Sequence, residues 1–334
     1  MSLSFETSTA LATFNDLIDI FRTDLITPRG CGNKHYKLTE NLLALKRQGC
    51  RRLLTFGGVW SNHLHAFAVA CNDLGITAVA AVRGEECATN ALLADAINHG
   101  LEVHYLSRAD YRLRGEVKFA RELCHSFGCD AWLPEGGSNQ LAVRGCEELA
   151  HLINQHMPVP PAHIVLAVGT GATLAGIVRG CQATQNVIGI PVVRDDRVSS
   201  QVQQWVGADS DNRSASWKLL DKAVTLKYAK VDDQLLRFVL GIYEQHGIVL
   251  DPVYNGKAFK ALLESELVNT KLAKRSGRKI VFVHTGGAGG CLGYASALRA
   301  VGDRCMADDY LNAARSMLGL SQVAHCLSFK CSVP

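Results

Sequence analysis

The chain has 334 residues, of which 48% are hydrophobic and 20% charged, and its formal net charge at pH 7 is +4. This length suits about two domains of roughly 150 residues each, and the composition excludes collagen, a coiled coil and a small disulfide-stabilised protein. No apolar run approaches the roughly 18 residues of a membrane span, so we expect no membrane association. Basic residues are spread along the chain, which argues against a nucleic-acid partner and favours a small molecule.

Twelve cysteines raise the question of disulfide bonds. The segment Met1–Glu6 lacks the basic region and the apolar core of a secretory signal, so we expect a reducing, cytoplasmic location. No CxxC pair occurs, and no histidine lies at zinc-finger spacing beside Cys124 and Cys129 or beside Cys326 and Cys331. Free thiols that pack as small hydrophobic groups therefore explain the cysteines better than a metal site does, and we expect no metal.

From Arg51 onward, short apolar runs alternate with longer segments of helical period, which is typical of a mostly parallel sheet covered by helices on both faces. The predicted fold class is therefore α/β. In the first half of the chain we expect strands at 52–56, 76–82, 101–106 and 131–133. We expect helices at 61–73, 90–99, 111–127 and about 139–156. The prolines within 157–161 then end the pattern, since proline interrupts helices and strands.

A second set of strands is predicted beyond these prolines, at 163–168, 186–193, 224–228 and 279–284, with helices between them. The polar stretch 207–217 is predicted to be a surface loop. The pattern weakens after about Gly302, and the tail from Cys326 has no predicted element. Two α/β units thus follow one another along the chain.

Two glycine-rich turns each follow a predicted strand, one at 169–176 (GTGATLAG) and one at 284–290 (HTGGAGG). A helix is expected to leave the first turn at Ala172, and N–H groups at such a helix start can bind a phosphate. The turn is neither a Walker A loop nor a GxGxxG motif, and close packing of the crossover is the alternative explanation. Ligands collect at the carboxyl ends of strands in open sheets, so both turns can face one crevice.

A third turn, Phe56–His63 (FGGVWSNH), also follows a predicted strand. Ser61 can act simply as a helix N-cap, because serine accepts a hydrogen bond from an early helical N–H. The surrounding residues do not form the GxSxG elbow of a hydrolase. His63 and His65 are two residues apart and face different sides of a helix, which argues against a metal pair.

Lys34 is the candidate nucleophile. Gly32 and Asn33 offer a helix start that places Lys34 in the first turn, where the positive helix end favours the neutral amine. A neutral lysine attacks carbonyl carbons. Lys37 shares the same helix face one turn further on. On local sequence alone, two solvated lysines on a surface helix explain this pattern more simply.

Taken together, these segments resemble a known enzyme family. The resemblance rests on 32–34 (GNK), 56–63, 134–139 (PEGGSN), 169–176, 250–257 (LDPVYNGK) and 284–287 (HTGG), in that order along the chain. The chain resembles the D-cysteine desulfhydrase and 1-aminocyclopropane-1-carboxylate deaminase family over about residues 16–295. These enzymes use pyridoxal 5′-phosphate and have fold type II, as in the tryptophan synthase β subunit. The resemblance implies two three-layer α/β domains with twisted, mostly parallel sheets.

The resemblance implies a role for each matching residue toward the cofactor. Lys34 would bind the cofactor as an imine and later move the α-proton of the substrate. Asn62 would hydrogen-bond the 3′-oxygen of the cofactor, and Lys37 would contact its phosphate. The phosphate would lie on the turn formed by Gly169, Thr170, Gly171, Ala172 and Thr173. Thr285 would meet the pyridine nitrogen, and a neutral hydroxyl there leaves that nitrogen less protonated than an aspartate would, which suits elimination.

The resemblance also implies the substrate contacts. The turn Ser61, Asn62 and His63 would receive the substrate carboxylate, with Ser61 as a candidate nucleophile or acid–base group. Tyr254 matches a tyrosine close to the substrate, and Tyr228 matches a second one more loosely.

Departures from the family pattern separate its subfamilies. The cyclopropane deaminases carry glutamate after the tyrosine matching Tyr254, and leucine at the position of Thr285. Here Asn255 and Thr285 stand at those places, while Tyr36 replaces a common arginine and Cys31 a common glycine. We therefore expect β-elimination on a small amino acid, with D-cysteine giving pyruvate, ammonia and sulfide. The alternatives are deamination of 1-aminocyclopropane-1-carboxylate to 2-oxobutanoate, another elimination or racemisation, and a binding protein without turnover.

The resemblance also implies how the chain is divided. We expect a small domain at 38–150 and a large cofactor-binding domain formed by 1–37 and 151–334, with a C-terminal extension from about 302. The crevice between the two domains would hold the cofactor. Members of the family are commonly homodimers, so a homodimer is expected.

Overall fold

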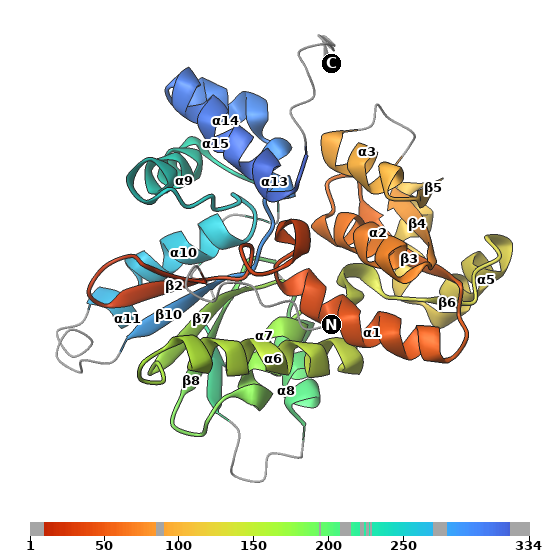
Figure 1. Ribbon diagram of the computed structural model, residues 1–334, viewed down its shortest axis with the longest axis horizontal. Coiled ribbons are helices and arrows are strands. Elements are labelled where there is room, and N and C mark those ends of the chain that lie inside the picture. Colours follow the sequence, from red (N-terminus) through yellow and green to blue (C-terminus); the bar gives the residue numbers. More distant parts are fainter. Residues whose placement is uncertain are drawn as a thin grey trace.

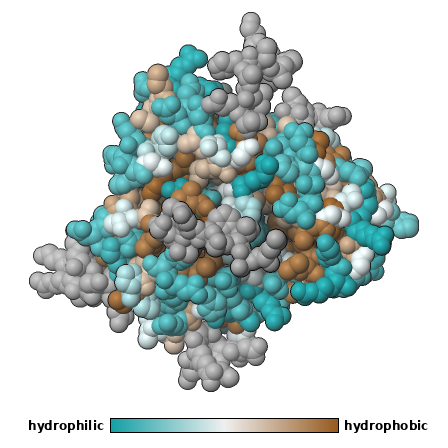
Figure 2. Space-filling view, in the orientation of Figure 1, coloured by the Kyte–Doolittle hydropathy of each residue, from teal (hydrophilic) through white to brown (hydrophobic). Residues whose placement is uncertain are grey.

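The structure of the protein is a computed structural model, and it describes residues 10–84, 90–193, 195–207, 215–220, 224, 227, 229–269 and 279–320. The chain forms two sheets with helices on both faces of each, and the smaller sheet lies on the right in Figure 1. No helix of the described part is long and apolar enough to cross a membrane. Hydrophilic residues cover most of the periphery of the face shown in Figure 2, and hydrophobic residues show mainly nearer its middle.

The strands and helices have the following bounds. The strands are β1 Leu11–Thr13, β2 Ile18–Arg22, β3 Arg52–Gly58, β4 Thr77–Arg83, β5 Leu101–Leu106, β6 Ala131–Trp132, β7 His163–Val168, β8 Asn186–Pro191, β9 Ser216–Leu219 and β10 Ile280–His284. The helices up to residue 180 are α1 Asn33–Arg47, α2 Asn62–Leu74, α3 Ala91–Asn98, α4 Arg108–Arg112, α5 Val117–Ser126, α6 Gln140–His156 and α7 Ala172–Gly180. The later helices are α8 Arg197–Val206, α9 Asp233–His246, α10 Asn255–Glu264, α11 Glu266–Asn269, α13 Gly289–Leu292, α14 Ala295–Val301 and α15 Arg304–Met317. Short 3₁₀ turns lie at η2 Pro28–Gly30, η3 Leu113–Gly115 and η4 Glu135–Gly137.

The larger sheet has six strands in the order β1-β2-β10-β7-β8-β9, and all neighbours are parallel except β1 and β2. The smaller sheet has four parallel strands in the order β5-β4-β3-β6. In the larger sheet β10 lies between β2 and β7, with His284 opposite Arg22. The residues that follow β2, β7 and β10 therefore meet at one edge of the sheet, where ligand sites in such folds form.

Each sheet is buried between two helical layers. Residues of α6, α7 and α8 pack on one face of the larger sheet, and residues of α9, α10 and α15 pack on the other. The smaller sheet is covered by α1, α2 and α3 on one face and by α4 and α5 on the other. Both sheets are thus the middle layer of a three-layer α/β unit, as predicted. All strands of the smaller sheet fall inside the range 38–150, although these domain boundaries themselves stay a prediction.

Most predicted elements are present, and two differ. The helix expected at 111–127 is divided, because α4 ends at Arg112 and α5 begins only after the extended residue Glu116. The loop predicted at 207–217 is wrong at its end, where Ser216 and Trp217 begin β9 as an edge strand beside β8. Most of the strand predicted at 224–228, and the tail from Cys326, lie outside the described residues.

The N-terminal strands β1 and β2 were not predicted. Asn15 makes the turn between them, because its side-chain oxygen accepts the N–H groups of Leu17 and Ile18. β2 is buried throughout although it contains Asp19 and Arg22, so its pattern does not look like that of a core strand. At the other end of the chain α15 buries Ala307, Tyr310, Leu311 and Ala314, which makes the C-terminal extension part of the core.

The cysteines of the described residues are free thiols. Cys71, Cys124, Cys146, Cys181 and Cys291 are buried. Their burial agrees with the prediction that they pack as small hydrophobic groups.

Candidate active site

Gly32 fixes the start of the lysine helix against the end of β10. Its φ is +55° and its ψ −136°, and a Cβ on it would lie 2.3 Å from the carbonyl oxygen of Thr285. The next residue, Asn33, donates its N–H to that same oxygen at 3.2 Å. Only glycine allows this approach of two backbones. The approach places Lys34 in the first turn of α1, as the sequence predicts.

The amine of Lys34 is held by neutral groups. Its Nζ donates to Oδ1 of Asn33 at 2.8 Å, and Asn33 in turn donates to the hydroxyl of Thr173 at 2.9 Å. Burial lowers the pKa of Lys34, while Cys146 and Asp251 partly oppose the shift. The neutral, nucleophilic form of the amine is therefore favoured, which is the direction the sequence predicts.

A cradle for an anion lies beside this lysine, at the carboxyl end of β7. Gly171, with φ +90°, is the N-cap residue of α7, and no side chain caps the helix. A Cβ on Gly171 would lie 2.6 Å from a methyl group of Val202, so glycine is required there too. The N–H groups at the start of α7 thus face outward from a turn of small residues, where an anion can bind.

Lys37 and two hydroxyls complete the cradle. Nζ of Lys37 donates to Oγ of Ser138 at 2.6 Å and lies 3.5 Å from Oγ1 of Thr170, and the two hydroxyls lie 2.5 Å apart. Burial, together with the charge of Lys34, lowers the pKa of Lys37 to about 7. In the described part of the chain neither of the two amines forms an ion pair with a carboxylate, and buried amines beside a helix start favour a bound anion. Ser138 belongs to the PEGGSN segment, but no role of its own was predicted for it.

Ser61, Asn62 and His63 begin α2 on the opposite side, above the smaller sheet. Oγ of Ser61 accepts the N–H of Leu64 at 3.3 Å, so Ser61 is a helix N-cap, whatever else it does. The side chain of Asn62 reaches α13, since a Cβ on Gly289 at the start of that helix would lie 2.7 Å from Oδ1 of Asn62.

The ring of His63 points into the interior. Its Nε2 lies 2.8 Å from Oγ1 of Thr55, and because that hydroxyl donates to the carbonyl of Leu133, Nε2 carries the proton. Nδ1 is buried and has no hydrogen-bond partner among the described residues. Burial, with Lys37 and Lys34 nearby, holds the pKa of His63 well below its ordinary value. The ring of His63 is thus anchored at Nε2, and its Nδ1 can accept a hydrogen bond.

The turn before α10 closes the site around Thr285. A Cβ on Gly169 would lie 3.4 Å from the ring of Tyr254, so this tyrosine lies over the phosphate turn. Asn255 is fully buried, and its Oδ1 accepts from both the N–H and the hydroxyl of Thr285. Burial raises the pKa of Asp251, and hydrogen bonds from Asn255 and Tyr254 oppose that shift. Tyr228, the second predicted tyrosine, lies outside the described residues.

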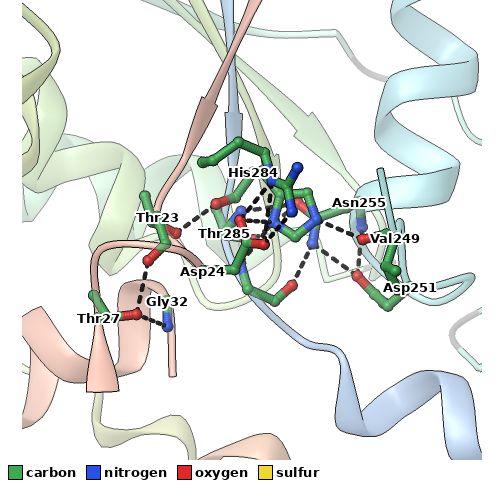
Figure 3. Close-up of polar contacts among 11 residues, drawn as sticks. Thr23, Asp24, Thr27, Gly32, Val249, Asp251, Asn255, His284 and Thr285 are labelled. Carbon is green, nitrogen blue, oxygen red and sulfur yellow. Dashed lines mark hydrogen bonds and ion pairs between the residues drawn. The ribbon is translucent and has the colours of Figure 1, made fainter. Parts of the chain in front are cut away.

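A buried charged group supports the end of β10 (Figure 3). His284 lies with Nδ1 2.9 Å from Oδ1 of Asp24 and with Nε2 2.7 Å from the carbonyl of Val249. Asp24 also pairs with Arg22 at 2.6 Å. Burial would raise the pKa of Asp24, but His284 and Arg22 outweigh it and hold that pKa well below its ordinary value.

Hydroxyl groups connect the pair Asp24 and His284 to the start of α1, the helix that carries Lys34. Thr23 donates to the carbonyl of His284, Thr27 donates to the carbonyl of Thr23 at 2.7 Å, and the hydroxyl of Thr27 accepts the N–H of Gly32 at 2.8 Å. His284 lies in a recognised segment, but no sequence signal paired it with Asp24, which is 260 positions away. Among the predicted site residues, Lys34 is joined through Asn33 to Thr173, and Lys37 lies beside Thr170.

Comparison with known proteins places this geometry in a family. A family model described as "Pyridoxal-phosphate dependent enzyme" matches residues 20–286. The protein of Arabidopsis thaliana named "Bifunctional D-cysteine desulfhydrase/1-aminocyclopropane-1-carboxylate deaminase, mitochondrial" is 30% identical over 80% of this chain and 71% of its own length. A solved structure titled "Crystal Structure Analysis of the ACC deaminase homologue" has a TM-score of 0.71 and 26% identity, covering 85% of this chain and 88% of that one. A fungal L-serine ammonia-lyase from Rhizomucor miehei, 16% identical with a TM-score of 0.60 over 85% of this chain and 92% of that one, shares the fold.

The residues present fit the cofactor that this family uses. Pyridoxal phosphate requires an amine for its aldehyde and a cationic seat for its phosphate. Lys34 offers a buried amine whose neutral form is favoured. The start of α7, with Lys37, Ser138 and Thr170, offers an uncapped and positively charged cradle beside it.

Proposed function

This chain belongs to the pyridoxal-phosphate dependent enzymes, in the family of D-cysteine desulfhydrase and 1-aminocyclopropane-1-carboxylate deaminase, and we propose that it catalyses β-elimination on D-cysteine. The balanced reaction is D-cysteine plus water giving pyruvate, ammonia and hydrogen sulfide. Elimination as the reaction class follows from the family, whereas D-cysteine as the substrate is the proposal.

The environment of Asn255 carries this choice of substrate. The amide is fully buried and donates to Asp251 and to the carbonyl of Gly286. The chain therefore has no carboxylate at the position where the ring-opening deaminases of the family carry glutamate. With Thr285 in place of their leucine, this supports elimination over ring opening.

The chain's own residues supply binding and proton transfer. When bound, the cofactor supplies an electron sink that stabilises negative charge on the α-carbon of the substrate. We assign the phosphate to the turn 169–173 with Lys37, and the 3′-oxygen to Asn62. The main-chain N–H groups of 61–63 receive the substrate carboxylate, and Tyr254 closes the site over the phosphate turn.

Lys34 is the proposed base. Its amine would take the α-proton of the substrate at Nζ. Because this amine is tethered beside the reacting carbon, it acts at a high effective concentration. Burial lowers the pKa of this amine, which favours the neutral form that can accept the proton.

A side-by-side product assay tests the proposal. Purified enzyme with cofactor is given D-cysteine, L-cysteine and 1-aminocyclopropane-1-carboxylate, and pyruvate, sulfide and 2-oxobutanoate are measured. We expect pyruvate and sulfide from D-cysteine, and loss of both, with loss of the absorbance at about 420 nm, in Lys34→Ala. Lys46→Ala is the matched control, since Lys46 is exposed at the far end of the same helix and donates to the carbonyl of Leu74. Pyruvate formation by Lys34→Ala would refute the role of this lysine.

The alternatives correspond to other results of the same assay. Release of 2-oxobutanoate as the main product would make the chain a cyclopropane deaminase. Interconversion of D- and L-amino acids without pyruvate would indicate racemisation. Binding of cofactor and amino acid without any product would indicate a binding protein. Light scattering of the holoenzyme tests the expected homodimer.

A further inference from the structure

A tryptophan beside the candidate substrate seat spans the two α/β units. Trp60 follows β3 of the smaller sheet and directly precedes Ser61, the N-cap of α2. Its indole lies against Gly293, the residue that ends α13 in the unit of the larger sheet. A Cβ on Gly293 would lie 3.2, 3.3 and 3.5 Å from Cδ2, Cε2 and Cγ of Trp60. Because three neighbouring ring atoms are almost equally distant, the indole turns its face, and not its edge, to the glycine.

The same side of α13 makes a second, inner contact with the smaller unit. Gly289 lies four residues before Gly293, and positions four apart share one side of a helix. A Cβ on Gly289 would lie 2.7 Å from Oδ1 of Asn62 and 2.7 Å from both methyl groups of Leu92. Leu92 is 1% exposed and belongs to α3, which lies beside α13 in Figure 1. The inner contact is therefore buried, and the indole of Trp60 forms its outer edge.

The indole is held in this place by contact alone. Trp60 is 39% exposed, and in the part of the chain that the structure describes no residue forms a hydrogen bond with its Nε1. The main chain around it is fixed, because Nδ2 of Asn90 donates to the carbonyl of Val59 at 2.8 Å. Ser61 also donates its N–H to the carbonyl of Gly58 at 3.0 Å. The backbone of this turn is thus anchored, whereas the ring can move off the glycine without breaking a hydrogen bond.

We propose that Trp60 is a specificity-determining residue, whose indole covers the substrate seat and limits the enzyme to amino acids with small side chains. The inference rests on the proposed function, because it takes from it that the N–H groups of 61–63 receive the substrate carboxylate. A carboxylate bound at the N–H of Ser61 lies one residue away from the indole. A long substrate side chain and the ring of Trp60 then compete for the same space.

The consequence is selection by the size of the side chain. D-cysteine adds only one sulfur atom beyond its β-carbon, so it makes the smallest demand on the space near the ring. An aromatic amino acid would have to push the indole off Gly293, and the apolar surfaces that part would become exposed to water at a cost in free energy. Because no hydrogen bond holds the ring, bulky amino acids should still bind, but more weakly.

Titration of the holoenzyme with alanine and phenylalanine, each as both enantiomers, tests this without turnover. Binding is followed by the change in absorbance of the bound cofactor. In wild type we expect the dissociation constant of phenylalanine to exceed that of alanine by about tenfold or more. In Trp60→Ala the two constants should become nearly equal, whereas Trp60→Phe, which keeps a flat ring, should preserve the difference. Leu113→Ala is the matched control, since Leu113 of the smaller unit is exposed to the same degree, 38%.

The fluorescence of the ring gives a second readout, which a merely structural role of Trp60 would not change. Phenylalanine should shift the tryptophan emission of wild type toward the red, because the indole leaves Gly293 for water. Alanine should not produce this shift, and Trp60→Phe should not show it with either amino acid.

Each result decides the matter. Equal affinity of wild type for alanine and phenylalanine overturns the inference, as does a difference that persists unchanged in Trp60→Ala. If Trp60→Ala does not fold, Trp60→Leu decides in its place, because leucine is apolar but has no ring to cover Gly293. If neither amino acid changes the cofactor absorbance of wild type, the seat at 61–63 is wrong and this inference fails with it. Failure of the proposed function alone looks different, because selection by size without pyruvate from D-cysteine would leave this inference standing.

Discussion

Replacement of Gly32 by alanine tests whether the contact between two backbones places the catalytic lysine. An alanine at φ +55° and ψ −136° sits in a sparsely populated region, at a cost of about 1–3 kcal/mol. Its Cβ would also lie 2.3 Å from the carbonyl oxygen of Thr285 and 2.6 Å from Cα of Gly286. These neighbours are backbone atoms that must move together with β10, and such overpacking costs about 1–3 kcal/mol more. We therefore expect Gly32→Ala to lose about 2–6 kcal/mol of unfolding free energy, a large part of the stability of an ordinary domain.

Gly49→Ala is the matched control. Gly49 also has a positive φ, +84°, but a Cβ there meets no atom within 4 Å, so only the strain of about 1–2 kcal/mol remains. Urea unfolding of both variants, with cofactor absorbance and affinity measured in parallel, separates strain from collision. Gly32→Ala should lose cofactor affinity and Gly49→Ala should keep it. Equal stability and equal cofactor binding in the two variants would refute the role given to Gly32.

Three further substitutions probe the cradle and the buried pair. The pKa of Lys37 is about 7 in the folded protein against an ordinary 10.5, so its charge destabilises the apoenzyme most below pH 7 and hardly at all above pH 10.5. Lys37→Met should therefore stabilise the apoenzyme most below pH 7, and it should also weaken cofactor binding. Urea unfolding midpoints and cofactor titrations across this pH range measure the two effects. Ser138→Ala, which removes the acceptor of the Lys37 amine, should weaken cofactor binding by about tenfold in a fluorescence titration, whereas an unchanged affinity would remove Ser138 from the phosphate site. Because the pKa of Asp24 is lowered in the folded protein, this carboxylate stabilises the fold above its ordinary pKa, and the stabilisation is lost as pH falls. Asp24→Asn should therefore lower the free energy of unfolding by about 3–5 kcal/mol near pH 7 and by less near pH 4. A loss that does not change with pH in urea unfolding would contradict the ion pair.

The sequence predicts those parts of the fold that local patterns specify. The strands from Arg52 onward are short apolar runs between segments of helical period. This pattern alone is enough to recognise a buried parallel strand in the sequence. β2 is not recognised in this way because Asp19 and Arg22 lie within it. Asp19 is paired with Lys279 at 3.1 Å, a partner 260 residues away that no local pattern reveals.

The same division holds within the site. Gly32 and the phosphate turn carry their own stereochemical signature, so a motif can locate them. The pair Asp24 and His284, by contrast, forms only because β2 lies beside β10 in the finished sheet. Ser138 lies within a recognised segment, but its role depends on Lys37, which belongs to α1.

Asn255 lies beside the buried carboxylate of Asp251, and Asn255→Asp tests whether the site tolerates a second carboxylate there. The new carboxylate would be nearly isosteric with the amide, but it would lie about as close to Asp251 as Nδ2 does now, 2.8 Å. Two carboxylates at that distance cannot both ionise in a buried site, so the pair retains a proton and one folded pKa rises by about 2–3 units. A raised folded pKa contributes full stability below the unfolded value near 4 and loses it as pH rises. Asn255→Asp should thus be destabilised by about 3–4 kcal/mol at pH 7 and recover toward pH 4.5, as measured by urea unfolding of the apoenzyme at both pH values. A variant as stable as wild type at pH 7 would show that Asp251 is itself protonated in the folded protein.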